Sequence, residues 1–215
     1  MTTAALDNDI LLKGACYGLL KHMLAAIPVE ANQAGYLGAA PFVLMARIGR
    51  LTLSKDRQAV RDALKSLFES AQALEPTPDE TKAAAEIEYA AQSKNLQLDV
   101  GESQLCAMVI SRNIPWLVTG DKRAIRALES LLAEIQSLTE LSGKIICLEQ
   151  LIIRGIALFG AKEIRGYVCA EPGVDRALAI CFECGNTDPA QDVGVPGLQS
   201  YIADLRQAAK TLLVP

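Results

Sequence analysis

Short apolar segments alternate with longer helical stretches along this chain, and that alternation limits the folds it can adopt. Residues 6–12, 115–119 and 144–148 are short apolar runs of strand length. Segments with apolar residues at helical spacing follow each of them. Consecutive parallel strands need a long crossover, usually a helix, so this order favours a parallel sheet covered by helices. The sequence therefore predicts an α/β fold with three layers, α/β/α, around a central parallel sheet.

Apolar spacing and capping residues divide the rest of the chain. We expect a first helix at 13–27, ended by Pro28, and a loop rich in Gly and Ala at 32–41. Ser54 is the expected N-cap of the helix at 57–73. Other helices are expected at 42–51, 80–93, 101–111, 121–133, 150–159, 174–184 and 198–212. We assign residues 1–150 to the α/β domain and 151–215 to a C-terminal helical extension packed on it.

Composition limits which partners and which cellular compartment we expect for the protein. The net charge is −4, so contact with a nucleic acid would need a local basic surface. No apolar run reaches the roughly 20 residues that span a bilayer, so no membrane contact is expected. Six cysteines without a recognisable secretion signal predict reduced thiols in the cytoplasm. Cys181 and Cys184 form one CxxC pair, and zinc commonly takes two such pairs, so we expect buried thiols there.

Acidic residues occur at three places where a parallel sheet would put ligands. Asp7 lies within the first apolar segment, Glu102 lies at the head of a helix, and Asp121 follows the segment 115–119. Ligands of such sheets bind at the carboxyl ends of the strands, and crowded carboxylates are costly unless a cation compensates them. We expect one divalent-metal site. Singly, Asp7 could be a turn residue, Glu102 could complement a helix N-terminus, and Asp121 could be an N-cap.

These motifs resemble those of the PIN domain family of metal-dependent ribonucleases. They read Leu6-Asp7-Asn8-Asp9-Ile10-Leu11-Leu12, Gly101-Glu102-Ser103-Gln104 and Leu117-Val118-Thr119-Gly120-Asp121, the last followed by Lys122-Arg123-Ala124. The resemblance covers roughly residues 5–150. It implies that Asp7, Glu102 and Asp121 hold Mg²⁺ or Mn²⁺, which favour oxygen ligands. It also implies supporting positions for Asp9, Asp99 and Thr119, and cleavage of RNA by a metal-activated water.

The sequence departs from the family pattern at one acid. The family usually has a Glu on the helix after the first loop, and here residues 41–50 contain no carboxylate. Ala46 or Arg47 occupies the expected place. Asp9, Glu30 or Asp99 could replace the missing acid; otherwise the site has lost part of its affinity for metal.

Basic residues near the acidic motifs are candidates for contact with an RNA backbone. They are Arg47, Arg50, Arg57, Lys122 and Arg123. The alternative is that these side chains form solvated helix faces. Aromatic residues make up only 5% of the chain, so we expect little reading of base sequence.

Three functions remain open at the level of the sequence. The first is a PIN-like nuclease that acts on RNA. The second is a catalytically weakened PIN-like binding or scaffold protein that acts through homo-oligomerisation by its apolar C-terminal helices. The third is a hydrolase of small phosphate esters that uses the same carboxylates.

Overall fold

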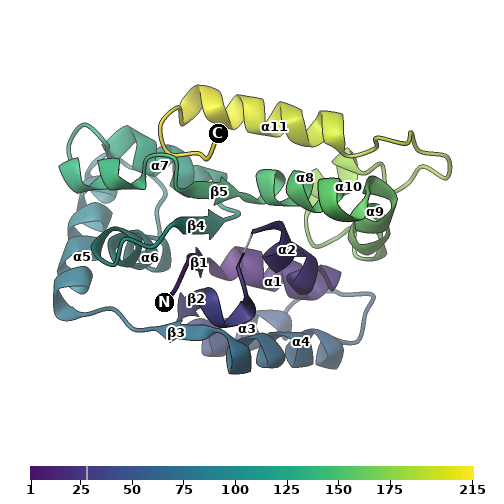
Figure 1. The fold of residues 1–215 in the computed structure, drawn as a ribbon, viewed down its shortest axis with the longest axis horizontal. Coiled ribbons are helices and arrows are strands. Elements are labelled where there is room, and N and C mark those ends of the chain that lie inside the picture. Colours follow the sequence, from purple (N-terminus) through teal and green to yellow (C-terminus); the bar gives the residue numbers. More distant parts are fainter. Residues whose placement is uncertain (28) are drawn as a thin grey trace.

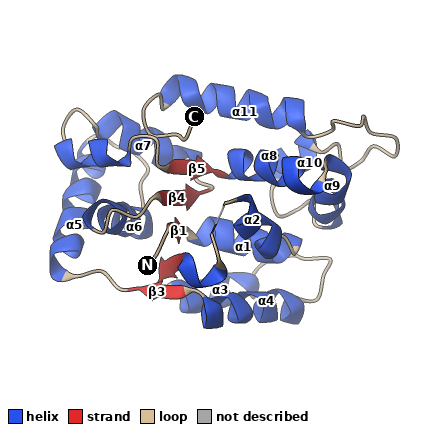
Figure 2. Cartoon of the chain, viewed as in Figure 1, coloured by secondary structure: helices blue, strands red, loops and turns tan. Residues whose placement is uncertain are grey.

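The computed structural model describes residues 1–27 and 29–215, and its centre is an all-parallel sheet (Figures 1 and 2). The strands are β1 (Ala4–Leu6), β2 (Ala34–Leu37), β3 (Gln72–Leu74), β4 (Trp116–Thr119) and β5 (Ile145–Cys147). They are arranged in the order β3-β2-β1-β4-β5. The alternation of short apolar strands with helical crossovers therefore gives the predicted α/β fold.

Helices connect the strands and cover both faces of the sheet (Figure 1). They are α1 (Asn8–Tyr17), α2 (Leu20–Ala26), α3 (Ala40–Ile48), α4 (Arg57–Ser70), α5 (Pro78–Ser93), α6 (Val100–Ser111), α7 (Lys122–Leu131), α8 (Leu148–Phe159), α9 (Ala161–Ala170), α10 (Arg176–Cys181) and α11 (Val195–Ala208). Two 3₁₀ turns, η1 (Ala31–Gln33) and η2 (Gln136–Leu141), complete the connections.

The sheet separates two hydrophobic clusters, as the period of a strand requires. In β1, Ala4 and Leu6 join the cluster under α1, α2 and α8, whereas Ala5 joins the cluster under α5, α6 and α7. Successive side chains of a strand point to opposite faces, so each short strand contributes to both clusters. The fold therefore has the three layers expected from the sequence.

The C-terminal segment contributes to the same two clusters. Leu151 and Ile152 of α8 pack on one face of the sheet, while Leu212 and Leu213 near the C-terminus belong to the other cluster. Leu213 also forms a parallel bridge with Ile145, beside the edge strand β5. The expected boundary at 150–151 falls inside α8. Among the helices in the described ranges, none is both long and apolar enough to cross a membrane.

The prediction of a strand at 6–12 is wrong for most of this segment. β1 ends at Leu6 and α1 begins at Asn8, with Ile10, Leu11 and Leu12 all buried in the helix. A short apolar run does not distinguish a strand from a helix that is buried on several sides. The helix expected at 13–27 is interrupted at Gly18, whose φ of 77° ends α1 before α2 begins. The expected stop at Pro28 lies outside the described residues.

Two strands and one helix were missed. β2 lies in the expected loop at 32–41, and β3 overlaps the last two residues of the expected helix at 57–73. Neither strand is rich in β-branched residues, so only pairing reveals them; a Cβ on Gly35 would lie 2.7 Å from a Leu74 side-chain carbon. The N-cap of α4 is Asp56 rather than Ser54, and α9 was not expected.

The expectation that all six thiols are reduced is wrong for one pair. Cys169 at the end of α9 is bonded to Cys184, which follows α10, and their Cα atoms lie 5.0 Å apart. The turn between α9 and α10 brings together two cysteines that are 15 residues apart, which sequence spacing alone does not indicate. Of the CxxC pair, Cys181 is a free thiol, as are the buried Cys16, Cys106 and Cys147.

We expect Cys169→Ser to lower the free energy of unfolding by roughly 3 kcal/mol in non-reducing buffer, because a loop of this length is no longer closed in the unfolded chain. Urea unfolding followed by circular dichroism measures the change. Cys181→Ser, which leaves the disulfide intact, is the matched control and should keep the wild-type response to reductant. Equal stability of the wild type with and without dithiothreitol would contradict the expectation.

Candidate metal site

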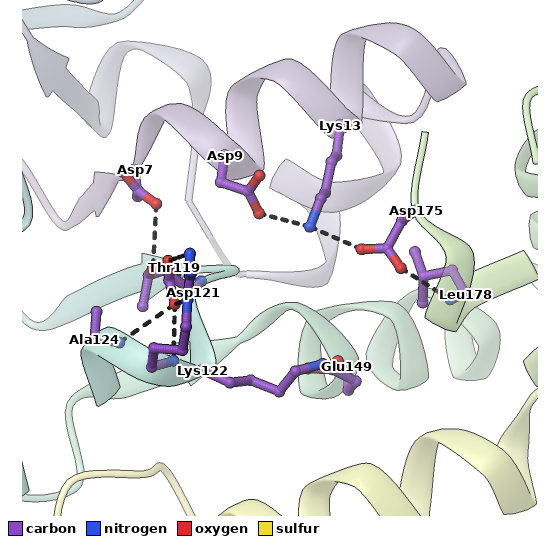
Figure 3. Close-up of polar contacts among 11 residues, drawn as sticks. Asp7, Asp9, Lys13, Thr119, Asp121, Lys122, Ala124, Glu149, Asp175 and Leu178 are labelled. Atoms are coloured by element: carbon purple, nitrogen blue, oxygen red, sulfur yellow. Dashed lines mark hydrogen bonds and ion pairs between the residues drawn. The ribbon is translucent and has the colours of Figure 1, made fainter. Parts of the chain in front are cut away.

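Parallel pairing of β1 with β4 brings two of the three acids together. Leu6 pairs with Val118. Asp7 follows β1 directly, and only Gly120 separates the end of β4 from Asp121. Both acids therefore lie at the same edge of the sheet, where α1 and α7 begin (Figure 3). Glu102, in the first turn of α6, reaches this edge from a neighbouring helix.

A cleft of about 850 Å³ at this edge collects charged side chains of both signs. Its acidic lining residues are Asp7, Asp9, Asp99, Glu102, Asp121 and Asp175, and its basic ones are Lys13, Arg47, Lys122 and Arg123. The cleft thus contains all three expected ligands. Two of the three possible replacements for the missing acid, Asp9 and Asp99, also line it. The third, Glu30, caps η1 and is not among the lining residues.

Asp7 is a buried carboxylate with little compensation. It is only 8% exposed, and its Oδ2 accepts a hydrogen bond of 3.1 Å from Thr119 Oγ1. Burial, with a further contribution from the charge of Asp9, raises its pKa to about 6. Thr119 Oγ1 in turn accepts a bond from the backbone N–H of Asp121, so it links both acids.

Glu102 both caps its helix and contributes charge to the cleft. Its backbone N–H donates to Asp99 Oδ1 at 2.8 Å, and its own Oε2 accepts from the N–H of Asp99 at 2.9 Å, which is a capping box. Burial, and then the charges of Asp99, Asp121 and Asp7, raise the pKa of Glu102 to about 8. The helix-start explanation considered for this residue is therefore compatible with a role in the cleft.

Asp121 differs because donors surround it. Oδ1 accepts from the backbone N–H groups of Arg123 and Ala124, which makes Asp121 the N-cap of α7. Oδ2 lies 2.8 Å from the guanidinium of Arg123. Burial acts to raise the pKa of Asp121, but the hydrogen bonds from Arg123 outweigh it and the net pKa is lowered.

The expected RNA contacts do not all reach the cleft. Arg47 and Arg123 line it from α3 and α7. Lys122 lines it too, but Nζ lies 2.5 Å from Oε1 of the buried Glu149, which neutralises its charge. Arg57 donates to the Leu51 carbonyl at 2.8 Å, and neither it nor Arg50 is among the lining residues.

Two charged residues of the cleft, Lys13 and Asp175, were not singled out from the sequence. Lys13 lies four residues after Asp9, a spacing that pairs acids with lysines on a helix and could have indicated it. Asp175 comes from the segment before α10, and only its N-cap position could be read from sequence. Lys13 contacts both Asp9 and Asp175, and their charges raise its pKa although burial acts to lower it.

The cleft fits a divalent cation in donor chemistry but is not arranged as a finished metal site. In the part of the chain that the structure describes, no three Asp, Glu, His or Cys side chains converge as ligands of one ion. The carboxylate of Glu102 is bonded within its own capping box, and the guanidinium of Arg123 pairs with the carboxylate of Asp121. Since the Arg123 side chain is 69% exposed, it can leave Asp121 with little loss of packing. Asp7 and Glu102 also supply carboxylate oxygens, the ligands that hard cations prefer.

We expect Arg123→Ala to raise the affinity for Mn²⁺ roughly two- to fivefold, since an exposed ion pair that competes with the metal is worth under about 1 kcal/mol. Isothermal titration in the absence of nucleic acid measures it. Arg126→Ala, which removes an arginine of the same helix that pairs with Asp204, is the matched control and should leave the affinity unchanged. A lower affinity in Arg123→Ala would show that Arg123 supports rather than competes with the metal.

A search with protein-family models, curated proteins and solved structures finds no match to this chain. The candidate site therefore depends on the geometry and chemistry of its own residues. Those residues are three acids from β1, α6 and β4–α7 in one cleft, two of them with raised pKa values.

Proposed function

We propose that this protein is a PIN-like nuclease that uses Mg²⁺ or Mn²⁺ to cleave RNA phosphodiester bonds. The single observation that carries the proposal is the gathering of Asp7, Glu102 and Asp121 in one cleft at the carboxyl edge of a parallel sheet. These are the three acids that occur in the order and spacing of the family motifs. The raised pKa values of Asp7 and Glu102 reflect burial and neighbouring acids that oppose their charged forms, which a bound cation would favour.

A divalent ion bound there would lower the pKa of a bound water and neutralise charge on the attacked phosphate. The chain supplies the rest. Thr119 Oγ1 fixes the carboxylate of Asp7 and the backbone of Asp121 relative to one another. With its pKa raised to about 8, Glu102 would hold a proton near neutral pH, and a cation bound beside it would favour the charged form.

Arg47 and Arg123 support a phosphate-rich substrate. They line the cleft from different helices, and an arginine guanidinium binds phosphate oxygens with two donors at once. An RNA strand that contacts Arg123 would draw it away from Asp121. On this proposal, substrate binding therefore helps to free a metal ligand.

The second candidate is a catalytically weakened PIN-like protein that binds a partner or its own copies. The observation that favours it is that cations of the chain already occupy part of the acidic cluster. Arg123 pairs with Asp121, and Lys13 pairs with Asp9 and Asp175. Such a protein would keep the fold and lose hydrolysis.

The test is incubation of the purified protein with labelled single-stranded RNA in Mn²⁺, in Mg²⁺ and in excess EDTA. We expect cleavage with either ion and none in EDTA. DNA of the same sequence and a generic phosphomonoester are parallel substrates. Hydrolysis of the phosphomonoester without cleavage of RNA would contradict the proposal in favour of the phosphatase-like hydrolase. Uncleaved RNA together with a stable oligomer in solution would favour the second candidate.

A further inference from the structure

Lys13 places a positive charge inside the acidic cleft (Figure 3). Its Nζ lies 2.7 Å from Asp9 Oδ2 and 2.7 Å from Asp175 Oδ2. The side chains of the three residues are 16%, 25% and 14% exposed, in the order Lys13, Asp9, Asp175. One ammonium thus bridges carboxylates from α1 and from the start of α10, in a largely enclosed position.

The ammonium lies beside the segment that carries the metal ligand Asp121. A Cβ on Gly120 would be 3.6 Å from Lys13 Nζ and 2.1 Å from Asp9 Oδ2. Glycine at 120 therefore leaves the space in which the Asp9 carboxylate approaches the backbone between β4 and α7. Any larger residue would displace the carboxylate that Lys13 binds.

Asp175 is held in place from its other side. Its Oδ1 accepts a hydrogen bond of 3.0 Å from the backbone N–H of Leu178, as the N-cap of α10. Its Oδ2 remains for Lys13. The two carboxylates, presented from α1 and from the start of α10, form the kind of oxygen pair that takes a cation, and the cation bound there is the lysine.

We propose that Lys13 is the built-in second cation of this site. Its ammonium occupies the position between Asp9 and Asp175 that a second divalent ion would take, so the site binds one ion per chain. In a two-ion site, the second ion offsets the charge of the acids that surround the reacting phosphate, and here Lys13 would offset the charge of Asp9 and Asp175. The link to a phosphate rests on the proposed function, whereas the occupation of the position does not.

The number of Mn²⁺ ions bound per chain tests the inference. Isothermal titration, checked by the paramagnetic resonance signal of free Mn²⁺, should give one ion for the wild type and two for Lys13→Met. The added ion should be lost again in the double variant Lys13→Met with Asp175→Asn. Lys65→Met is the matched control, because Lys65 lies beside Asp62 on the exposed face of α4, and it should bind one ion.

One ion in both the wild type and Lys13→Met would overturn the inference and leave the proposed metal site intact. No ion in the wild type, with one in Lys13→Met that Asp175→Asn removes, would support the inference and overturn the proposed function. Lys13→Met leaves two carboxylates unpaired, so circular dichroism must first show that it is folded. If it is not, Lys13→Gln keeps a donor for one carboxylate and has the same expected count of two.

Discussion

Asp7→Asn is expected to reduce metal-dependent RNA cleavage by at least about 100-fold and to stabilise the metal-free protein. The loss follows because the amide removes a charged ligand, and even groups that only support ligands are worth 10- to 100-fold. The metal-free protein becomes more stable because burial makes the ionised form of Asp7 unfavourable in the folded state, and Asn has no charge to bury. Asn at this position still accepts the hydrogen bond from Thr119 Oγ1.

The direction of the stability change follows from proton linkage. The pKa of Asp7 is about 6 in the folded protein against 3.8 as its ordinary value, so the folded state binds more protons between these pH values. Stability therefore falls as the pH rises from about 3.8 to 6 and stays reduced above that range. At pH 8 the difference corresponds to roughly 3 kcal/mol, which Asp7→Asn recovers. Urea unfolding in EDTA at pH 5 and pH 8 measures it.

Asp121→Asn separates the two effects. It should lose cleavage like Asp7→Asn, but it should not gain stability, because the pKa of Asp121 is lowered by its donors rather than raised. Asn is a good N-cap, so α7 should remain intact. Asp79→Asn, at an exposed acid in the first turn of α5, is the control that should change neither property. Cleavage retained by both Asp7→Asn and Asp121→Asn would exclude the proposed site.

Arg112→Ala is expected to lower the free energy of unfolding by about 3 kcal/mol at pH 7. Arg112 lies at the end of α6, and its guanidinium donates to both carboxylate oxygens of Glu80, each at 2.7 Å. Glu80 is only 3% exposed, so the variant leaves a buried charge without its partner. Chemical denaturation measures the loss. Arg126→Ala breaks the exposed pair with Asp204 and should cost under about 1 kcal/mol.

The effect of Arg112→Ala should depend on pH in the opposite sense to that of Asp7→Asn. Hydrogen bonds from Arg112 lower the pKa of Glu80 to about 2 from an ordinary 4.5, against the effect of burial. The stabilisation is therefore complete above about pH 4.5 and is lost as the pH falls toward 2. A stability gap between wild type and variant that is as large at pH 2 as at pH 7 would contradict this account.

Strands and helices with a strong local signal could be predicted from the sequence. Glu102 at the head of a predicted helix and the apolar run before Thr119 correctly indicated α6 and β4. β2 and β3 could not be predicted, because Ala34, Gly35 and Gln72 have no preference for strands. They become strands only because β1 offers β2 a free edge to pair with, and β2 in turn offers one to β3.

The candidate site likewise combines features with a local sequence signal and features that only tertiary contacts create. The sequence by itself determined that acids follow or open the right elements, since Asp7, Glu102 and Asp121 are local features of strand ends and helix starts. Only the tertiary structure decided which charges face those acids. Lys13 reaches Asp175, and Lys122 reaches Glu149, across 162 and 27 positions of the chain. Spacing along the sequence carries no information about such pairs, because the packing of α8 beside β5 and of α10 against α9 and α11 brings them together.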